Sequence, residues 1–168
     1  KDSFFKILFF GRMDSKKNVL ELLDVDQEAG TLIFTGAGKE GGDPYFHYLY
    51  RVNKDGSNLQ LLTPEKKHHR ILLSKNADYF LDRVSTPNQA ESSFIRSTLD
   101  TSSFALEKMD IGKLIATGWQ APMPFMVKDR NGEHDIHGLM YKPSDFDSSK
   151  SYPVINYLYP GPQVGSIR

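Results

Sequence analysis

Short β-prone runs separated by tight-turn signals constrain this chain more than any other feature of its sequence. The strongest run is Tyr45-Phe-His-Tyr-Leu-Tyr-Arg-Val52, and similar runs cover residues 19–25, 31–35 and 59–63. Turn-forming residues lie between the runs, and the pair Asp55-Gly56 is typical of a hairpin. We therefore predict four short strands that form one antiparallel sheet.

The same pattern of short β-prone runs separated by turns begins again near residue 71. Further β-prone runs cover residues 71–74, 79–84 and 93–98, with a polar break over residues 85–92. A repeat of about 40 residues that contains four short strands is typical of a β-propeller blade. One four-stranded sheet leaves a face uncovered, so we expect such a unit to have neighbouring blades.

The pattern changes after residue 103. Apolar spacing over residues 104–116 is mostly helical and predicts a short helix, with the surest turn at Asp110-Ile-Gly-Lys-Leu-Ile115. Two β-prone runs, residues 125–127 and 136–141, then flank Asn131-Gly132, which reads as a hairpin turn. Residues 153–159 are apolar on both faces except for one Asn, which is typical of a strand inside a parallel sheet.

Composition narrows the possible functions. The 168 residues include 21 basic and 21 acidic side chains, so no basic field points to nucleic acid. No cysteine is present, which excludes disulfides and a cysteine nucleophile, and no run of about 18 apolar residues predicts a membrane span. The chain also lacks an initiator Met, and we expect it to be part of a longer polypeptide.

Two histidine pairs suggest a metal site but are better explained otherwise. His134 and His137 would point to opposite faces of a strand and could not share one ion. His68 and His69 have no cysteine or HExxH motif to assist them. We therefore interpret all four as surface histidines and expect no metal and no cofactor.

Two further motifs fall short of the chemistry they suggest. The glycine-rich stretch over residues 36–42 lacks the Gly-Lys-Ser/Thr of a phosphate-binding loop and fits a hairpin loop instead. Ser166 comes closest to a nucleophile elbow, but Val164 and Arg168 stand where Gly-x-Ser-x-Gly requires glycine. Neither motif marks an active site within this chain.

The end of the sequence carries a more specific signal. Lys150-Ser-Tyr-Pro-Val-Ile-Asn-Tyr-Leu-Tyr-Pro-Gly-Pro162 follows Ile136-His-Gly-Leu-Met-Tyr-Lys-Pro-Ser-Asp-Phe146. Together they resemble the dipeptidyl peptidase IV family of serine peptidases, in the prolyl oligopeptidase group. The run from Leu49 to Gly56 and the run from Leu73 to Phe80 are similar to strands of that family's propeller blades. The resemblance covers roughly residues 19–165.

The resemblance implies a domain organisation. It makes the chain a mainly β fragment: residues 1–103 are the last blade or blades of a propeller, and residues 104–122 are a crossover with a short helix. Residues 123–168 are then the first strands of an α/β-hydrolase (peptidase) domain. Such an isolated piece would expose apolar edges, so we expect homo-oligomers or self-association.

The resemblance also implies a function. The family hydrolyses peptides with a Ser-Asp-His triad, and all three members would lie after Arg168, so the fragment itself is expected to be inactive. The full-length parent would release N-terminal X-Pro or X-Ala dipeptides. Internal cleavage stays open as an alternative, because the family's acidic pair that grips the substrate amino terminus belongs to an earlier propeller region. Tyr159 falls on the family's oxyanion-hole tyrosine, and Gly161 and Pro162 would shape its loop. The resemblance favours an extracytoplasmic location.

One alternative is open at this point. A propeller-type module that binds peptides without catalysis would show the same repeats. A Gly-x-Ser-x-Gly elbow about 80 residues beyond the loop would indicate the enzyme, and its absence would indicate the binding module.

Overall fold

The computed structural model describes residues 18–157, and these residues form two compact units. Apart from the turn at Thr86–Ala90, the first unit contains the described residues through Lys108. The second unit contains the remainder from Met109. Each unit is described separately below.

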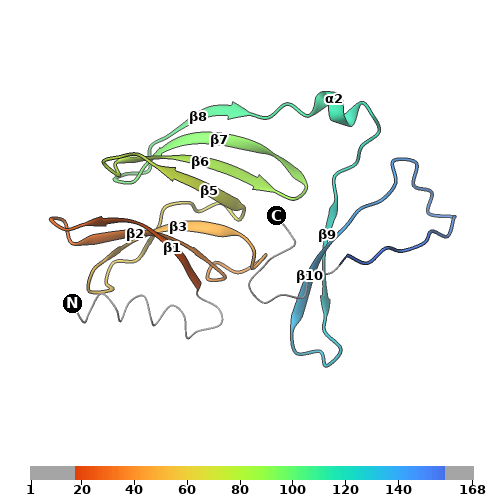
Figure 1. Cartoon of the computed structure of the whole chain (residues 1–168), viewed down its shortest axis with the longest axis horizontal. Helices are drawn as coiled ribbons and strands as arrows, with labels where there is room; N and C mark the ends of the chain where they lie inside the picture. The colour runs from red at the N-terminus through yellow and green to blue at the C-terminus, as the bar shows by residue number, and fades with distance from the viewer. Residues whose placement is uncertain (1–17, 158–168) are drawn as a thin grey trace. The chain divides into compact units, whose positions relative to one another are not determined.

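The first unit consists of two four-stranded antiparallel sheets (Figure 1). One has the order β1-β2-β3-β4, from β1 (Asn18–Asp26), β2 (Thr31–Ala37), β3 (His47–Asn53) and β4 (Gln60–Leu61). The other has the order β5-β6-β7-β8, from β5 (His68–Leu73), β6 (Tyr79–Thr86), β7 (Gln89–Ser97) and β8 (Ser103–Lys108). The meandering, sequential order within each sheet confirms the prediction of a mainly β chain with blade-like repeats.

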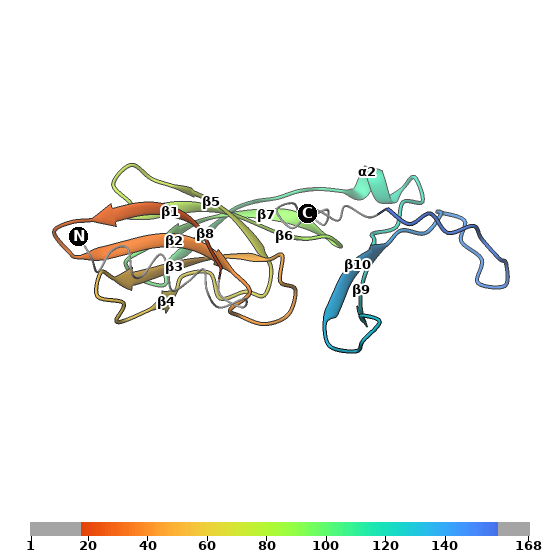
Figure 2. The ribbon, with the colours of Figure 1, turned by 60° about the horizontal axis from the view of Figure 1, so that its bottom comes forward.

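The two sheets form two layers in Figure 1 and overlap in the turned view (Figure 2), so they pack face to face. Ile33 of β2 and Leu49 of β3 are buried with Phe80 of β6, at 5 %, 0 % and 1 % exposure. Partly buried residues from both sheets surround them, namely Leu23, Leu62, Ile71, Leu73 and Ala77. Alternating side chains of each strand supply this core, because successive residues of a strand point to opposite faces of a sheet.

The predicted turns occur where expected. The β3–β4 connection closes with a hydrogen bond from the Gly56 N–H to the Asn53 carbonyl oxygen (2.8 Å), and Gly56 has φ of 86°. Left-handed backbone of this kind is the conformation that glycine adopts at little cost. The glycine-rich stretch at residues 36–42 leads from β2 into the loop before β3, as the hairpin interpretation predicted.

Two predictions for the second sheet are wrong. A polar break is predicted over residues 85–92, but β6 extends to Thr86 and β7 begins at Gln89. Only a tight turn separates the two strands. Residues 104–108 are not helical but form β8, which pairs with β7. The unpaired edge of β7 offers this segment a row of hydrogen bonds, which outweighs its weak helical spacing.

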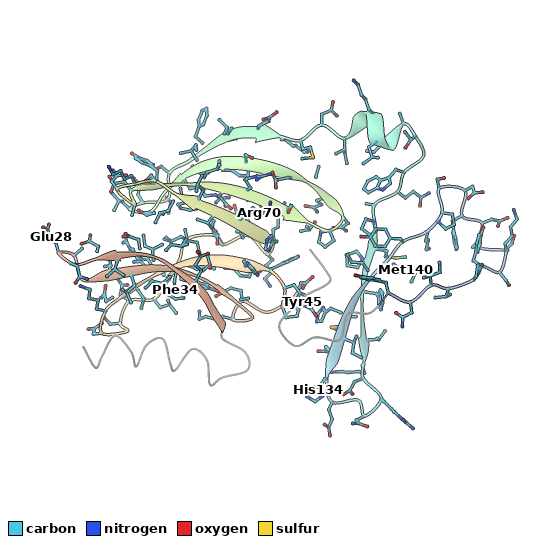
Figure 3. The ribbon with its side chains drawn as sticks, in the orientation of Figure 1. Glu28, Phe34, Tyr45, Arg70, His134 and Met140 are labelled. Atoms are coloured by element: carbon cyan, nitrogen blue, oxygen red, sulfur yellow. The ribbon has the colours of Figure 1, made fainter. Side chains whose placement is uncertain are left out.

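The second unit has few regular elements. Helix α2 (Gly112–Ile115) is a single turn, and β9 (Met123–Lys128) pairs with β10 (Asp135–Met140) around Asn131-Gly132 as predicted. Figure 3 shows His134 beside this turn and Met140 at the opposite end of β10. Within residues 18–157, no helix is long and apolar enough to cross a bilayer.

The strand predicted over residues 153–159 is not formed in the part that the structure describes. Residues 153–157 have no assigned strand, and Val154 and Ile155 are 91 % and 92 % exposed. A β-strand is defined by its ladder of hydrogen bonds to a neighbour, and none of the described strands pairs with this segment. Leu158 and Tyr159 lie outside the described residues.

Candidate functional site

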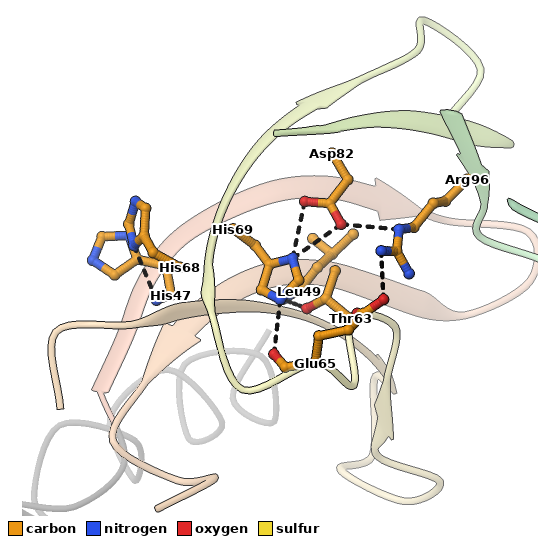
Figure 4. A network of polar contacts seen from close by, with 8 residues as sticks. All are labelled: His47, Leu49, Thr63, Glu65, His68, His69, Asp82 and Arg96. Carbon is orange, nitrogen blue, oxygen red and sulfur yellow. Dashed lines mark hydrogen bonds and ion pairs between the residues drawn. The ribbon is translucent and has the colours of Figure 1, made fainter. Parts of the chain in front are cut away.

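The most distinctive polar site of the described residues is a chain of four ionisable groups in the second sheet. His69 on β5, Asp82 on β6 and Arg96 on β7 meet Glu65, which lies between β4 and β5 (Figure 4). His69 and Asp82 are almost completely buried, at 1 % and 0 % exposure. Burial of charged groups is rare unless they are paired, so this cluster needs a reason.

The strand register brings these residues together. In the β5–β6 pair, His69 lies opposite Val84 and Ile71 lies opposite Asp82. His69 and Asp82 are therefore diagonal neighbours on one face, within reach of each other's side chains. The same face carries Phe80 and packs toward the first sheet, where the Tyr48 ring lies 5.7 Å from the His69 ring.

Each member of the site has a close partner. His69 Nδ1 lies 2.9 Å from both carboxylate oxygens of Asp82, and His69 Nε2 lies 3.0 Å from the Glu65 carbonyl oxygen. Arg96 forms an ion pair through Nε with Asp82 Oδ2 at 2.9 Å. Its Nη2 donates to Glu65 Oε1 at 2.6 Å. Arg96 lies between the carboxylates of Glu65 and Asp82, and its positive charge compensates the burial of both.

The pKa values of Glu65, at one end of the site, and of Tyr48, beside the His69 ring, are both shifted. Partial burial acts to raise the pKa of Glu65, but the hydrogen bond and positive charge of Arg96, with His69, outweigh it and hold that pKa below its usual value. Burial first, and the charges of Glu40 and Asp43 second, raise the pKa of Tyr48. The hydroxyl of Tyr48 is buried without a hydrogen-bond partner among the described residues.

This arrangement is suited to holding strands together and not to catalysis. It contains no nucleophile, and its central carboxylate is inaccessible to a substrate. It joins three adjacent strands to the segment that leads from one sheet to the next. Nearby, Thr63 Oγ1 accepts the Leu49 N–H at 2.9 Å, which fixes the same connection to β3.

The residues predicted as catalytic or loop-shaping are not placed by this structure. Tyr159, Gly161 and Pro162 all lie outside the described residues, as does Ser166. The interpretation of His69 as a surface histidine is wrong, because its side chain is fully buried against Asp82. His134 is exposed, with 76 % of its side-chain surface accessible, and contacts Asp129.

The sequence did contain a signal for the buried site. Alternation along β6 places Phe80 and Val84 inward, and Asp82 is the acidic residue between them. A carboxylate at an inward position of a strand implies a buried cationic partner. The spacing does not reveal which histidine or arginine supplies it.

Comparison with known proteins connects these sheets to a family. Residues 14–91 match the family model described as the dipeptidyl peptidase IV (DPP IV) N-terminal region. A probable dipeptidyl-aminopeptidase B of Ajellomyces dermatitidis is 28 % identical over 149 residues, and human dipeptidyl peptidase 8 is 25 % identical over 150 residues. Residues 14–91 are thus similar to the N-terminal region of the dipeptidyl peptidase IV family.

Two solved structures are similar to this chain in fold. A putative dipeptidyl aminopeptidase IV from Bacteroides ovatus matches 88 % of this chain with a TM-score of 0.68 and 26 % identity. Porphyromonas gingivalis dipeptidyl peptidase 4 matches 81 % with a TM-score of 0.63 and 20 % identity, which supports the fold alone. Both matches extend beyond the two sheets, because residues 18–108 are little more than half of the chain.

The chain corresponds to a small part of each of these similar proteins. The alignment with the fungal relative spans 82 % of this chain and 15 % of the relative. The alignment with the human relative spans 84 % of this chain and 16 % of the relative. In the two solved structures this chain corresponds to 20 % and 19 % of the longer chain.

Proposed function

We propose that this chain joins the end of a β-propeller to the start of an α/β-hydrolase domain in a DPP IV-like serine peptidase. Two stacked four-stranded sheets support the propeller part, and the β9–β10 hairpin after the short helix supports the change of domain. Because β8 continues the second sheet through Lys108, the boundary proposed here lies after this residue rather than at residue 103.

The proposed reaction is the release of N-terminal X-Pro or X-Ala dipeptides from peptides, by acyl transfer to a serine and hydrolysis. The observation that carries this proposal is that relatives over more than 80 % of the chain are named dipeptidyl peptidases or dipeptidyl-aminopeptidases. The sequence contains no Gly-x-Ser-x-Gly elbow, so we propose that the 168 residues alone are inactive.

Within this chain, Tyr159 is the proposed catalytic contribution. By resemblance to the family, its hydroxyl would donate a hydrogen bond to the oxyanion of the tetrahedral intermediate, and Gly161 with Pro162 would shape the loop that holds it. Donors of this kind act on charge that develops only in the transition state.

The function is tested on the intact protein that contains this chain. We expect it to hydrolyse a Gly-Pro amide with a free N-terminus and to ignore the same substrate with a blocked N-terminus. Hydrolysis of both would indicate an endopeptidase. No hydrolysis of either substrate would favour the alternative of a peptide-binding propeller module. The 168-residue chain alone serves as the inactive control.

The role of Tyr159 is tested by Tyr159→Phe in the same intact protein. Loss of the hydroxyl should lower kcat by roughly 10²–10³ and leave KM nearly unchanged. A tyrosine that only packs would lose little activity as Phe. A kcat within about threefold of wild type would remove Tyr159 from the catalytic residues.

A further inference from the structure

Two adjacent histidines of β5 make different hydrogen bonds at the junction with the first sheet. His68 lies against His47 of β3, with ring centroids 4.6 Å apart in an edge-to-face arrangement. The backbone N–H of His47 donates to His68 Nδ1 at 3.3 Å. A nitrogen that accepts a hydrogen bond carries a lone pair, so His68 is neutral with its proton on Nε2.

His69 has the opposite pattern. Its Nδ1 faces the Asp82 carboxylate and its Nε2 faces the Glu65 carbonyl oxygen. A carbonyl oxygen can only accept a hydrogen bond, and the Asp82 carboxylate, which is ion-paired with Arg96, accepts as well. The ring must donate from both nitrogens, which is the pattern of the imidazolium form.

We infer that His68 and His69 are held in opposite protonation states, and that protonation of His68 in acid opens the β3–β5 contact while His69 stays bound to Asp82. A proton on His68 Nδ1 would point at the His47 N–H and abolish the hydrogen bond between the sheets. It would also place a second cation next to His69.

The charged and titratable groups around His68 and His69 act differently on the two rings. His47 of β3, with Arg70 and His69 of β5, acts against positive charge on His68, while the backbone of Tyr45 opposes this effect. His69 contacts Asp82 of β6 and Glu65 before β5, with Arg96 of β7 balancing Asp82 and Tyr48 of β3 beside the ring.

Burial gives the direction of the pH response. Desolvation first, then the charge of His47, lowers the pKa of His68 from 6.5 to about 4. The unfolded chain therefore binds more protons than the folded chain between these two values. The contribution of neutral His68 to stability is therefore complete above about pH 6.5, and it is lost as the pH falls from there toward 4.

The experiment compares urea unfolding of the full chain at pH 7 and pH 5, where most carboxylates stay ionised. For the wild type, we expect the unfolding equilibrium constant to rise about five- to tenfold, less than the full pKa shift implies because His68 is partly exposed. In His68→Asn, whose amide oxygen accepts the same N–H without titrating, the rise should stay below about twofold. A His68→Asn variant with the full wild-type pH response would overturn the inference.

His134→Asn is the matched control, because His134 is exposed at the β9–β10 turn and should leave the pH response unchanged. A second readout needs no variant: nitrogen NMR of the histidine rings reports protonation of each nitrogen. We expect two protonated nitrogens on His69 at pH 7 and a titration of His68 near pH 4. A His68 titration near 6.5, or a singly protonated His69 at pH 7, would contradict the proposal even if His68→Asn does not fold.

Discussion

Asp82 occupies a position of β6 that strand alternation reserves for the core, yet it is an acid. Its neighbours on the same face, Phe80 and Val84, are apolar and buried. Removing one member of a buried ion pair leaves the others charged and without compensation. Asp82 is the residue on which this effect is largest, because it contacts both His69 and Arg96.

Asp82→Ala should therefore reduce the free energy of unfolding by about 3–5 kcal/mol, measured by urea denaturation at pH 7. The matched control is Glu91→Gln in the same sheet, which breaks the Arg83–Glu91 ion pair at 2.7 Å. That pair is partly exposed, with 42 % of the Arg83 side chain accessible, so its loss should cost about 0–1 kcal/mol. Equal costs for the two variants would show that the buried site contributes no more than a surface pair.

At the level of single residues, the sequence predicts which charged side chain is buried, but it does not predict which residues pair with it. Alternation identifies Asp82 as inward, and the same rule places His69 on the inner face of β5 once the strand is known to begin at His68. Their contact depends on the register between β5 and β6, and Arg96 depends on the next strand pairing. Register is set by long-range pairing that no short motif records.

The strands and turns are the elements that the sequence predicted best. The Asp55-Gly56 and Asn131-Gly132 hairpins lie as predicted, because left-handed backbone selects these residue types locally. The helical spacing of residues 104–108 predicts a helix, but these residues form part of β8. Its apolar residues Phe104 and Leu106 also fit a period of two, and only the free edge of β7 decides between the alternatives.

Gly56→Ala should destabilise the first unit by about 1 kcal/mol in urea denaturation, because φ of 86° strains a residue with a Cβ. The added methyl meets no atom within 4 Å, so the cost is conformational and not steric. Gly56→Asn provides the control, since asparagine tolerates left-handed backbone better and should recover part of the loss. If Ala and Asn were equally destabilising, backbone strain would not be the cause.

On the scale of the whole molecule, the described residues present apolar surface at a sheet edge. Strand β8 ends the order β5-β6-β7-β8, and its residues Phe104 and Leu106 are 67 % and 57 % exposed. An edge strand with unpaired backbone groups is a template for pairing with another chain. The prediction of self-association is therefore assigned to a particular strand.

Leu106→Lys should reduce self-association of the 168-residue chain, because a charge on an edge strand opposes pairing with a second copy. Sedimentation velocity at about 100 μM measures it. Leu99→Lys is the matched control: Leu99 is 67 % exposed but lies in the turn between β7 and β8. A wild-type chain that sediments as a compact monomer would count against the prediction, as would equal effects of the two lysines.

Strand β3 has a mechanical consequence for the pair of sheets. Two positions along it are tied to the second sheet: the His47 N–H to His68, and the Arg51 guanidinium to the Thr98 carbonyl oxygen at 2.9 Å. Between them, the Leu49 N–H is tied to Thr63 in the connection between the sheets. A force that slides one sheet along the other loads both ties between the sheets at once, whereas a force that peels the sheets apart loads them in turn. The stack should therefore be stiffer in shear than in peeling.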